Sequence, residues 1–523
     1  MFIIKSQRKR ALGLNEPLKH GSHKKPVTRR DFLAQGFTTG AATVMVPALS
    51  TLSPRQAKAA LSGDLPDLAA LTTRCGLTGG DQRIPFICFD LAGGANIAGS
   101  NVLVGQQGGQ LDFLSTQGYS KLGLPGNMLP NNSTTNFVNA EFGLAFHSDS
   151  AFLRGMLEKT TATTRARVNG AVIAARSEND TGNNPHNPMY GLAKWGVKSN
   201  LLTLIGSQNS ESGGNSMSPA MYLNPEFRPT KIDRVSDVTG LVDTGDVAGI
   251  LSDSDTVRTL ETMYRLSNRK LGNVSTGLAG DADVKSQFKC AYLKSAATVD
   301  KFSDPTLLNP SIDPDVLSIF GANFGGDREF EKTASVMKLV IDGNAGAGTI
   351  TMGGFDYHTG ERATGEERDL RAGRCIGACL EYAALNNKPL MLYVFSDGSL
   401  SSNGMIDDSA GGRGKGQWTG DNQQTAASFF LVFNPLGRPT LLGADAAAQA
   451  RHQQIGYYSA GGDVVTSSSP AANNVNLLVQ TVILNYMALH GQQGDFTNKF
   501  GNALGGSLDG LTAFTPIVTG PVT

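Results

Sequence analysis

The sequence is poor in cysteine, in aromatic residues and in long apolar runs, and it carries no excess of either charge. Five cysteines among 523 residues are too few for a disulfide scaffold, and their number is odd. The 45 basic and 45 acidic side chains cancel, so the charge gives no sign of nucleic acid or of an anionic membrane surface as a partner. No stretch of about 18 apolar residues follows residue 59, and we expect no transmembrane segment in the mature chain.

The N-terminal segment has the parts of an export signal in their usual order. A basic stretch leads to the pair Arg29-Arg30, and a weakly apolar run rich in Gly, Ala and Thr covers residues 37–52. Ala57-Lys58-Ala59 then forms a small-x-small cleavage site. These features predict a twin-arginine signal peptide over residues 1–59, recognised by the twin-arginine export machinery, and a periplasmic or extracellular mature chain. The alternative is a basic tail with a chance arginine pair.

Beyond the signal, helical patterns alternate with continuous apolar runs. The runs expected to be buried strands are 84–91, 170–175, 201–205, 348–353, 389–395 and 426–433. Fully apolar strands separated by helices are typical of a mostly parallel central sheet flanked by helices on both faces, so we predict an α/β fold. We expect a single large domain over residues 60–523, with long loops, among them 399–424, and a Gly-rich C-terminal tail.

Polar clusters follow three of the predicted strands directly. They are Gly93-Gly94-Ala95-Asn96, Asp356-Tyr357-His358 and Ser396-Asp397, with Asp421-Asn422 further along the chain. Ligands of open α/β sheets bind outside the carboxyl ends of the strands. Oxygen and nitrogen ligands gathered there could hold a divalent metal that polarises a phosphoryl or sulfuryl oxygen. The alternative is a set of solvated turns, which often carry Asp and His.

The order of the motifs resembles that of an exported bacterial family catalogued as domain of unknown function 1501, in the alkaline-phosphatase and sulfatase-like superfamily. The resemblance covers roughly residues 84–433 and follows the twin-arginine signal. The corresponding segments are Leu91 to Asn101, Phe146-His147, Gly170 to His186, Phe330 to His358, Ser396-Asp397-Gly398 and Thr419 to Asn422. It implies an alkaline-phosphatase/sulfatase-like fold and a metal-dependent hydrolase of phosphate or sulfate esters.

The resemblance also implies a site. The divalent metal (zinc, calcium, magnesium or manganese) would be held by residues that match the family's ligand positions: Asp356, His358, Asp397, Asp421 and Asn96. The superfamily nucleophile is a Ser or Thr, for which Ser100 is the catalytic candidate and Thr359 the second choice.

Three positions depart from the family pattern. Asn96 stands where the family has a carboxylate, no Arg follows Ser396-Asp397-Gly398, and Asn422 stands where the family has His. Amides in place of ionised ligands weaken the binding of dications. The alternative function is therefore a catalytically silent exported protein for binding or surface assembly, which keeps the fold but has lost metal ligands.

Overall fold

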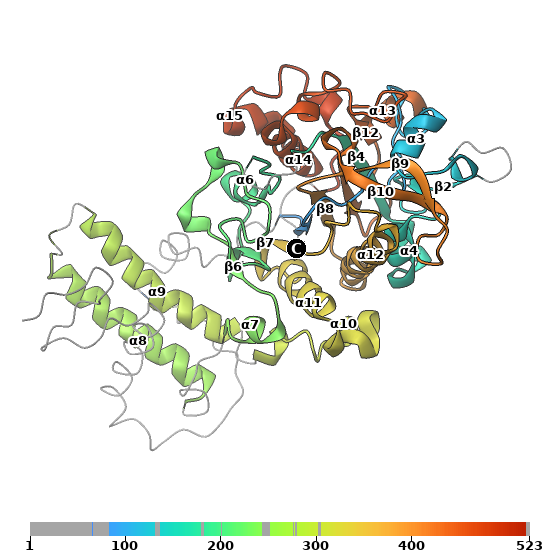
Figure 1. Cartoon of the computed structure of the whole chain (residues 1–523). Helices are drawn as coiled ribbons and strands as arrows, with labels where there is room; N and C mark the ends of the chain where they lie inside the picture. The colour runs from blue at the N-terminus through green and yellow to red at the C-terminus, as the bar shows by residue number, and fades with distance from the viewer. Residues whose placement is uncertain are drawn as a thin grey trace, which may run out of the picture. The chain divides into compact units, whose positions relative to one another are not determined.

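The computed structural model describes Leu65 and residues 83–130, 136–178, 183–199, 201–242, 251–275, 277, 280–301 and 305–518. The predicted signal peptide over residues 1–59 lies outside the described residues, so the export prediction stays a prediction. The chain divides into two compact units. The larger unit holds a central sheet, and the smaller one contains α8 (Asp253–Gly272) and nearly all of α9 (Asp281–Lys301), which are labelled in Figure 1.

An eight-stranded sheet forms the centre of the larger unit, in the order β12-β4-β11-β8-β1-β7-β5-β6. The strands are β1 (Phe86–Leu91), β4 (Val168–Ala174), β5 (Leu202–Gly206), β6 (Thr230–Lys231), β7 (Ala345–Met352), β8 (Leu390–Ser396), β11 (Ala427–Phe433) and β12 (Gln454–Ile455). All neighbours pair in parallel except β11, which is antiparallel to β4 and β8. The predicted mostly parallel α/β sheet is confirmed, whereas its superfamily stays a prediction.

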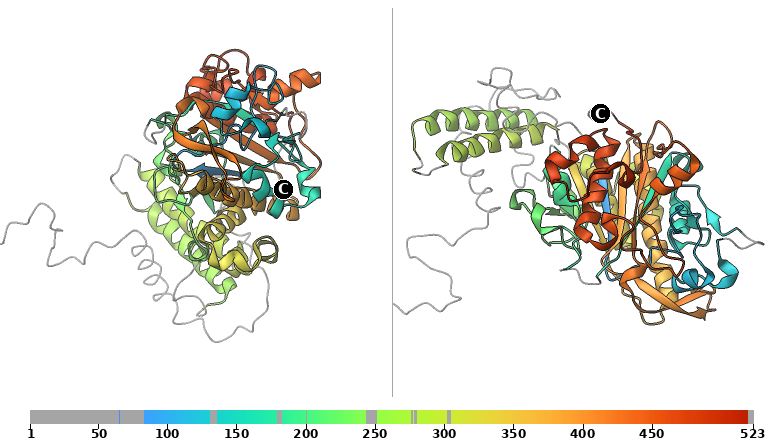
Figure 2. Two further views of the ribbon diagram at one scale, coloured as in Figure 1. Left: turned by 45° about the vertical axis from the view of Figure 1, so that its right-hand side comes forward. Right: turned by 90° about the horizontal axis from the view of Figure 1, so that it is seen from above.

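Both faces of the sheet are buried. Phe86 and Cys88 of β1 belong to one hydrophobic cluster, while Ile87 and Phe89 belong to another, because successive side chains of a strand point to opposite faces. Figure 2 shows helices on both sides of the strands. The first cluster includes side chains of α6 (Met189–Trp195) and α14 (Val475–Leu489), and the second includes those of α4 (Ala151–Lys159), α11 (Arg328–Ile341) and α12 (Arg362–Leu385).

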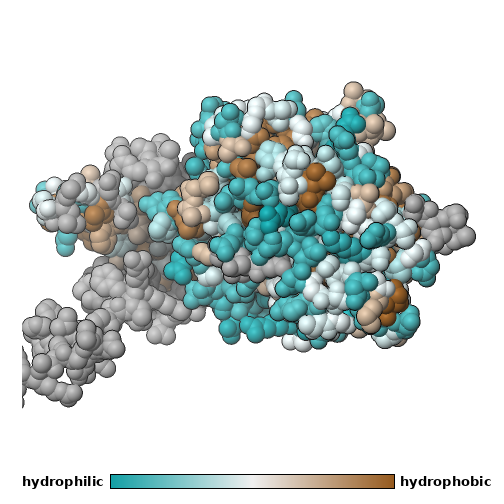
Figure 3. All heavy atoms as spheres, turned by 45° about the horizontal axis from the view of Figure 1, so that its top comes forward, coloured by the Kyte–Doolittle hydropathy of each residue, from teal (hydrophilic) through white to brown (hydrophobic). Residues whose placement is uncertain are grey.

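The remaining elements of the larger unit are short. The helices are α3 (Thr116–Lys121), α5 (Ala162–Arg165), α7 (Val235–Thr239), α10 (Pro314–Phe320), α13 (Ala446–Gln453) and α15 (Phe496–Phe500). The strands β2 (Val138–Asn139) and β3 (Phe146–His147) pair in antiparallel fashion. None of the described helices is long and apolar enough to cross a membrane. On the face in Figure 3, hydrophobic residues form small separate spots among hydrophilic ones.

A two-stranded hairpin stands where the sequence predicts a loop over residues 399–424. Its strands are β9 (Leu400–Asp407) and β10 (Lys415–Asp421), and their register shifts twice around Trp418. The loop prediction was wrong because β9 is a mostly polar strand whose apolar residues, Leu400, Met405 and Ile406, do not alternate with polar ones, so the sequence shows no strand periodicity. Lys415, fully buried, attaches the hairpin to α12, with Nζ 2.9 Å from a carboxylate oxygen of Glu366.

The cysteines differ in their bonding. Cys290 of α9 is disulfide-bonded. Cys88, Cys375 and Cys379 are free and buried. Burial raises the pKa of the Cys375 thiol to about 12, which keeps it protonated and unreactive. The free cysteines therefore act as small apolar core residues.

Candidate metal centre

Three neighbouring strands end level with one another at one edge of the sheet. Leu91, the last residue of β1, pairs with Met352 at the end of β7 and with Ser396 at the end of β8. All three strands run in the same direction, so the segments after them leave the sheet at its carboxyl edge. The polar clusters that the sequence places after these strands are thereby brought together.

The turn after β1 is hydrogen-bonded to the segments on both sides of it. The amide of Gly93 donates to Oδ1 of Asp397 (2.8 Å), after β8, and the amide of Ala95 donates to Oγ of Ser396 (2.8 Å). On the other side, the amide of Phe355, after β7, donates to the carbonyl of Ala92 (3.2 Å). The turn after β1 is therefore the link between the other two segments.

Glycine is required at position 93 of this turn. Its φ of +126° is strained for any residue with a side chain. A Cβ atom at Gly93 would also lie only 2.6 Å from the backbone nitrogen of Asp356. The missing side chain thus lets the backbone of the turn approach the backbone of Asp356 directly.

Asp356, His358 and Asp421 come together at this edge. Each offers one ligand atom, and these atoms all lie within 4.8 Å of one another, with His358 Nε2 3.0 Å from Asp356 Oδ1. Asp356 and His358 stand in the segment between β7 and α12, whereas Asp421 ends β10. The amide of Gly360 donates to the carbonyl of Trp418 (2.6 Å), which holds that segment against β10.

The donor set fits a divalent metal ion. Two carboxylates and one imidazole are ligands that zinc and manganese accept, with bonds of about 2.1 Å and therefore ligand atoms about 3 to 4 Å apart. Spacings of up to 4.8 Å need only a small inward movement of side chains that are 64% exposed at Asp356 and 36% exposed at His358. Three protein ligands leave a coordination position open, as in catalytic sites.

Asp397 is a buried carboxyl near Asp356. It is only 6% exposed, and its two carboxylate oxygens accept hydrogen bonds from the Gly93 amide and from Nδ2 of Asn215 (2.8 Å). Burial raises the pKa of Asp397, and the nearby charge of Asp356 raises it further. Asp397 is not part of the group of three, so its predicted role as a ligand stays a prediction.

Asp90 is a buried carboxyl that the sequence analysis did not select. Its Oδ2 accepts hydrogen bonds from the backbone amides of Asn215 (2.6 Å) and Ser216 (2.8 Å), while its buried Oδ1 has no hydrogen-bond partner among the described residues. Burial, together with the charge of Asp397, raises the pKa of Asp90 to about 7. A lone Asp near the end of an otherwise apolar strand is the sequence signal that could have pointed to it.

Asn96 and Ser100 face into the protein. Asn96 is fully buried. Its backbone amide donates a hydrogen bond to Oη of Tyr357 (3.2 Å), and its side-chain oxygen accepts one from Oγ of Ser100 (2.9 Å). Ser100 is 1% exposed, so its hydroxyl is enclosed, whereas Thr359 beside His358 is exposed. Asn96 and Ser100 are not in the group of three, and their predicted roles stay predictions.

A buried carboxyl supports the segment that carries two of the ligands. Tyr357, between Asp356 and His358, donates from Oη to Oδ1 of Asp369 on α12 (2.9 Å). Oδ2 of Asp369 accepts from Nδ2 of Asn101 (2.7 Å), and burial raises the pKa of Asp369 to about 7. No pattern in the sequence indicates this pair, which depends on how α12 packs.

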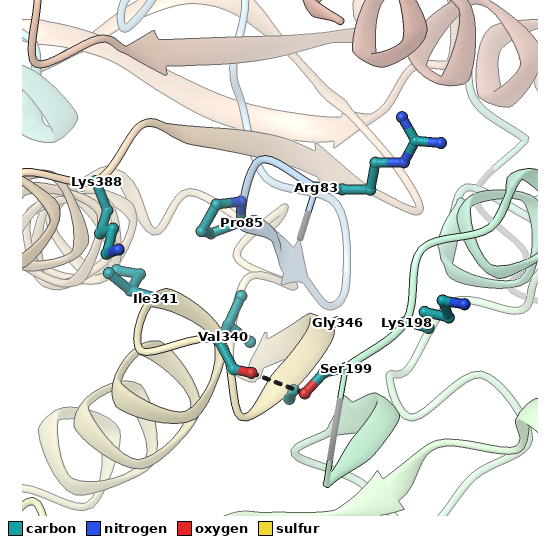
Figure 4. Close-up of a pocket in the computed structure, with 10 residues that line it drawn as sticks. Arg83, Pro85, Lys198, Ser199, Val340, Ile341, Gly346 and Lys388 are labelled. Atoms are coloured by element: carbon teal, nitrogen blue, oxygen red, sulfur yellow. Dashed lines mark hydrogen bonds between the residues drawn. The ribbon is translucent and has the colours of Figure 1, made fainter. Parts of the chain in front are cut away.

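A separate pocket opens at the other end of the strands. Figure 4 shows residues that line it, including Pro85 before β1 and Gly346 at the start of β7. Ser199 donates to the carbonyl of Gly343 (2.9 Å), and Arg83 lies 4.0 Å from the ring centre of Trp195. In Figure 4 the side chains of Arg83 and Lys198 do not converge on the pocket, which therefore offers no assembled group of ligands.

Comparison with known proteins places this chain in no family. No protein-family model matches it, and no curated protein matches it significantly. The resemblance to the exported family of unknown function therefore rests on the motifs alone.

Proposed function

We propose that the protein is an exported, metal-dependent hydrolase of phosphate or sulfate esters. The observation that carries the proposal is the meeting of Asp356, His358 and Asp421, whose ligand atoms lie within 4.8 Å of one another. They come from two distant parts of the sequence, at the carboxyl edge of a mostly parallel sheet, where α/β proteins bind ligands.

A divalent ion in this position would polarise the ester and lower the pKa of a bound water. The chain's own residues orient the ligands. The backbone of Gly93 packs on Asp356, and the bond from Tyr357 to Asp369 holds the backbone between Asp356 and His358. Because Ser100 is enclosed, we favour an attacking water over a serine nucleophile.

Export is supported by two features of the chain. The Arg29-Arg30 segment resembles a twin-arginine signal, which would pass the chain to the twin-arginine machinery. Cys290 is disulfide-bonded, and disulfides persist mainly in oxidising compartments such as the periplasm. We propose a periplasmic or extracellular location, with a small-molecule or polymer ester as the substrate.

A second candidate function is an exported binding or surface-assembly protein without catalytic activity. Asn96 favours it, because this position has a carboxylate in the family and here holds an amide bonded to Ser100 inside the protein. A protein with this function would keep the fold without hydrolysing an ester.

The test is elemental analysis of protein purified without chelators, combined with hydrolysis of p-nitrophenyl phosphate and p-nitrophenyl sulfate. Wild type is compared with Asp356→Ala/His358→Ala and with Asp408→Ala, which removes an exposed carboxylate from the β9–β10 hairpin. We expect about one equivalent of metal in wild type and Asp408→Ala, and loss of metal and hydrolysis in the double variant. Absence of metal from wild type would contradict the hydrolase and favour the second candidate, and bound metal without hydrolysis of either ester would contradict the proposed substrate class.

A further inference from the structure

An arginine of α12 reaches the segment that carries the candidate ligands. The guanidinium of Arg368 packs on Gly354, where a Cβ atom would lie 3.1 Å from Nε and 3.3 Å from Cζ. Gly354 has a φ of +87°, which favours glycine. The missing side chain at position 354 thus gives the guanidinium the space that it occupies.

Arg368 has no partner among the described residues. Within the described part of the chain, its side chain takes part in no hydrogen bond, ion pair or ring contact. The next two arginines of the same helix are both paired, Arg371 with Asp327 (2.7 Å) and Arg374 with Glu158 (2.5 Å). The unpaired arginine of the three is therefore the one that packs on the ligand-bearing segment.

Arg368 also lies close to the candidate metal centre. Gly354 precedes Asp356 by two residues, which separates their Cα atoms by about 7 Å at most. Gly354 and Asp356 are both exposed, so a ligand can reach this edge from solvent.

We propose that Arg368 binds the anionic group of the substrate, a tetrahedral phosphoryl or sulfuryl group. This inference rests on the proposed function and names the residue that recognises the substrate class. A guanidinium presents a planar fork of N–H donors that matches two oxygens of such a group, and it stays charged at every physiological pH. Arg368 thus favours phosphate and sulfate esters over neutral esters.

The test is calorimetric titration of inorganic phosphate, and separately of sulfate, into metal-loaded protein. Wild type is compared with Arg368→Gln, Arg368→Lys and the matched control Arg374→Gln, which removes one positive charge from the same helix. We expect Arg368→Gln to weaken binding by about tenfold or more, Arg368→Lys to keep part of the affinity, and Arg374→Gln to bind like wild type. The anion that binds wild type more tightly indicates whether phosphate or sulfate esters are preferred.

Metal content, measured on the same samples, separates this inference from the proposed function. Equal metal in all variants with unchanged anion affinity in Arg368→Gln would overturn the role of Arg368 and leave the metal centre standing. Equal loss of affinity in Arg368→Gln and Arg374→Gln would overturn it too, because general charge would then explain the binding. Wild type without metal would contradict the proposed function, and the role of Arg368 would fall with it.

Discussion

The amide of Gly93 donates a 2.8 Å hydrogen bond to Oδ1 of Asp397. This bond joins the turn after β1 to the end of β8, and the same glycine packs on the backbone of Asp356. One residue thus connects a buried carboxylate with an exposed candidate ligand. The geometry of the edge therefore depends on a position that contributes no side chain.

Replacement of Gly93 by alanine is expected to displace Asp356. The new Cβ would lie 2.6 Å from the Asp356 nitrogen, and the φ of +126° adds strain. We expect Gly93→Ala to lower the free energy of unfolding by about 2 kcal/mol or more and to weaken metal binding. Gly353→Ala is the matched control, because no atom of the described residues lies within 4 Å of the position that its Cβ would take. Equal stability and metal content in both variants would contradict this account of the turn.

The charge state of Asp90 should make stability depend on pH. Its pKa in the folded protein is about 7, above the usual 3.8. Between these two pH values Asp90 is therefore protonated in the folded chain and ionised in the unfolded chain. The bound proton stabilises the folded state, and this contribution to the free energy of unfolding is fully present below pH 3.8 and is lost as the pH rises through 7.

Asp90→Asn keeps an oxygen for the Asn215 and Ser216 amides but carries no charge. Between pH 4.5 and 7.5, the free energy of unfolding of wild type should therefore fall relative to this variant, by on the order of 2 kcal/mol or more. Urea denaturation across this range measures the difference. Parallel pH profiles for the two proteins would refute the raised pKa of Asp90.

Glu366 is expected to be necessary for the position of the β9–β10 hairpin. Burial alone would raise its pKa, but Arg362 and Lys415 lower it, and both of these cations are almost completely buried. Glu366→Gln removes the carboxylate that pairs with Arg362 (2.6 Å) and leaves Lys415 with Asp149 alone (3.3 Å), so we expect a loss of about 3 kcal/mol in the free energy of unfolding.

The matched control is Glu158→Gln, which breaks the more exposed pair with Arg374 and should cost about 1 kcal/mol or less. Chemical denaturation of both variants measures the two values. Similar small losses would mean that the buried charges are not needed to hold the hairpin.

The strands and the edge at which they end could be predicted from sequence, while the inward-facing contacts could not. The apolar run of β8 ends directly before Asp397. The position of Asp397 at the carboxyl edge therefore followed from the prediction of a parallel sheet. The burial of Asp397 and its bond to Asn215 depend on a loop that sequence periodicity does not describe. The same limit applies to Ser100, a polar residue after a strand whose hydroxyl proves to be enclosed.

The contribution of α12 was also hidden in the sequence. The sequence shows a helical pattern over residues 369–385, but α12 begins at Arg362, and its first turns carry Glu366 and Arg368. These charged residues show no apolar periodicity, so the pattern gave no reason to extend the helix. Glu366 pairs with Lys415 of β10, and Arg368 packs on Gly354 after β7, contacts that only the tertiary structure brings about.

The central claim is that Asp421, from the hairpin, completes a metal site with Asp356 and His358. The most direct measurement is the calorimetric titration of zinc and of manganese into metal-free wild type, Asp421→Ala and Asp408→Ala, each checked for folding by circular dichroism. We predict that Asp421→Ala weakens binding by about tenfold or more while Asp408→Ala binds like wild type, because Asp421 belongs to the group of three and Asp408 does not. Equal affinities in Asp421→Ala and wild type, or no binding by wild type, would contradict the account.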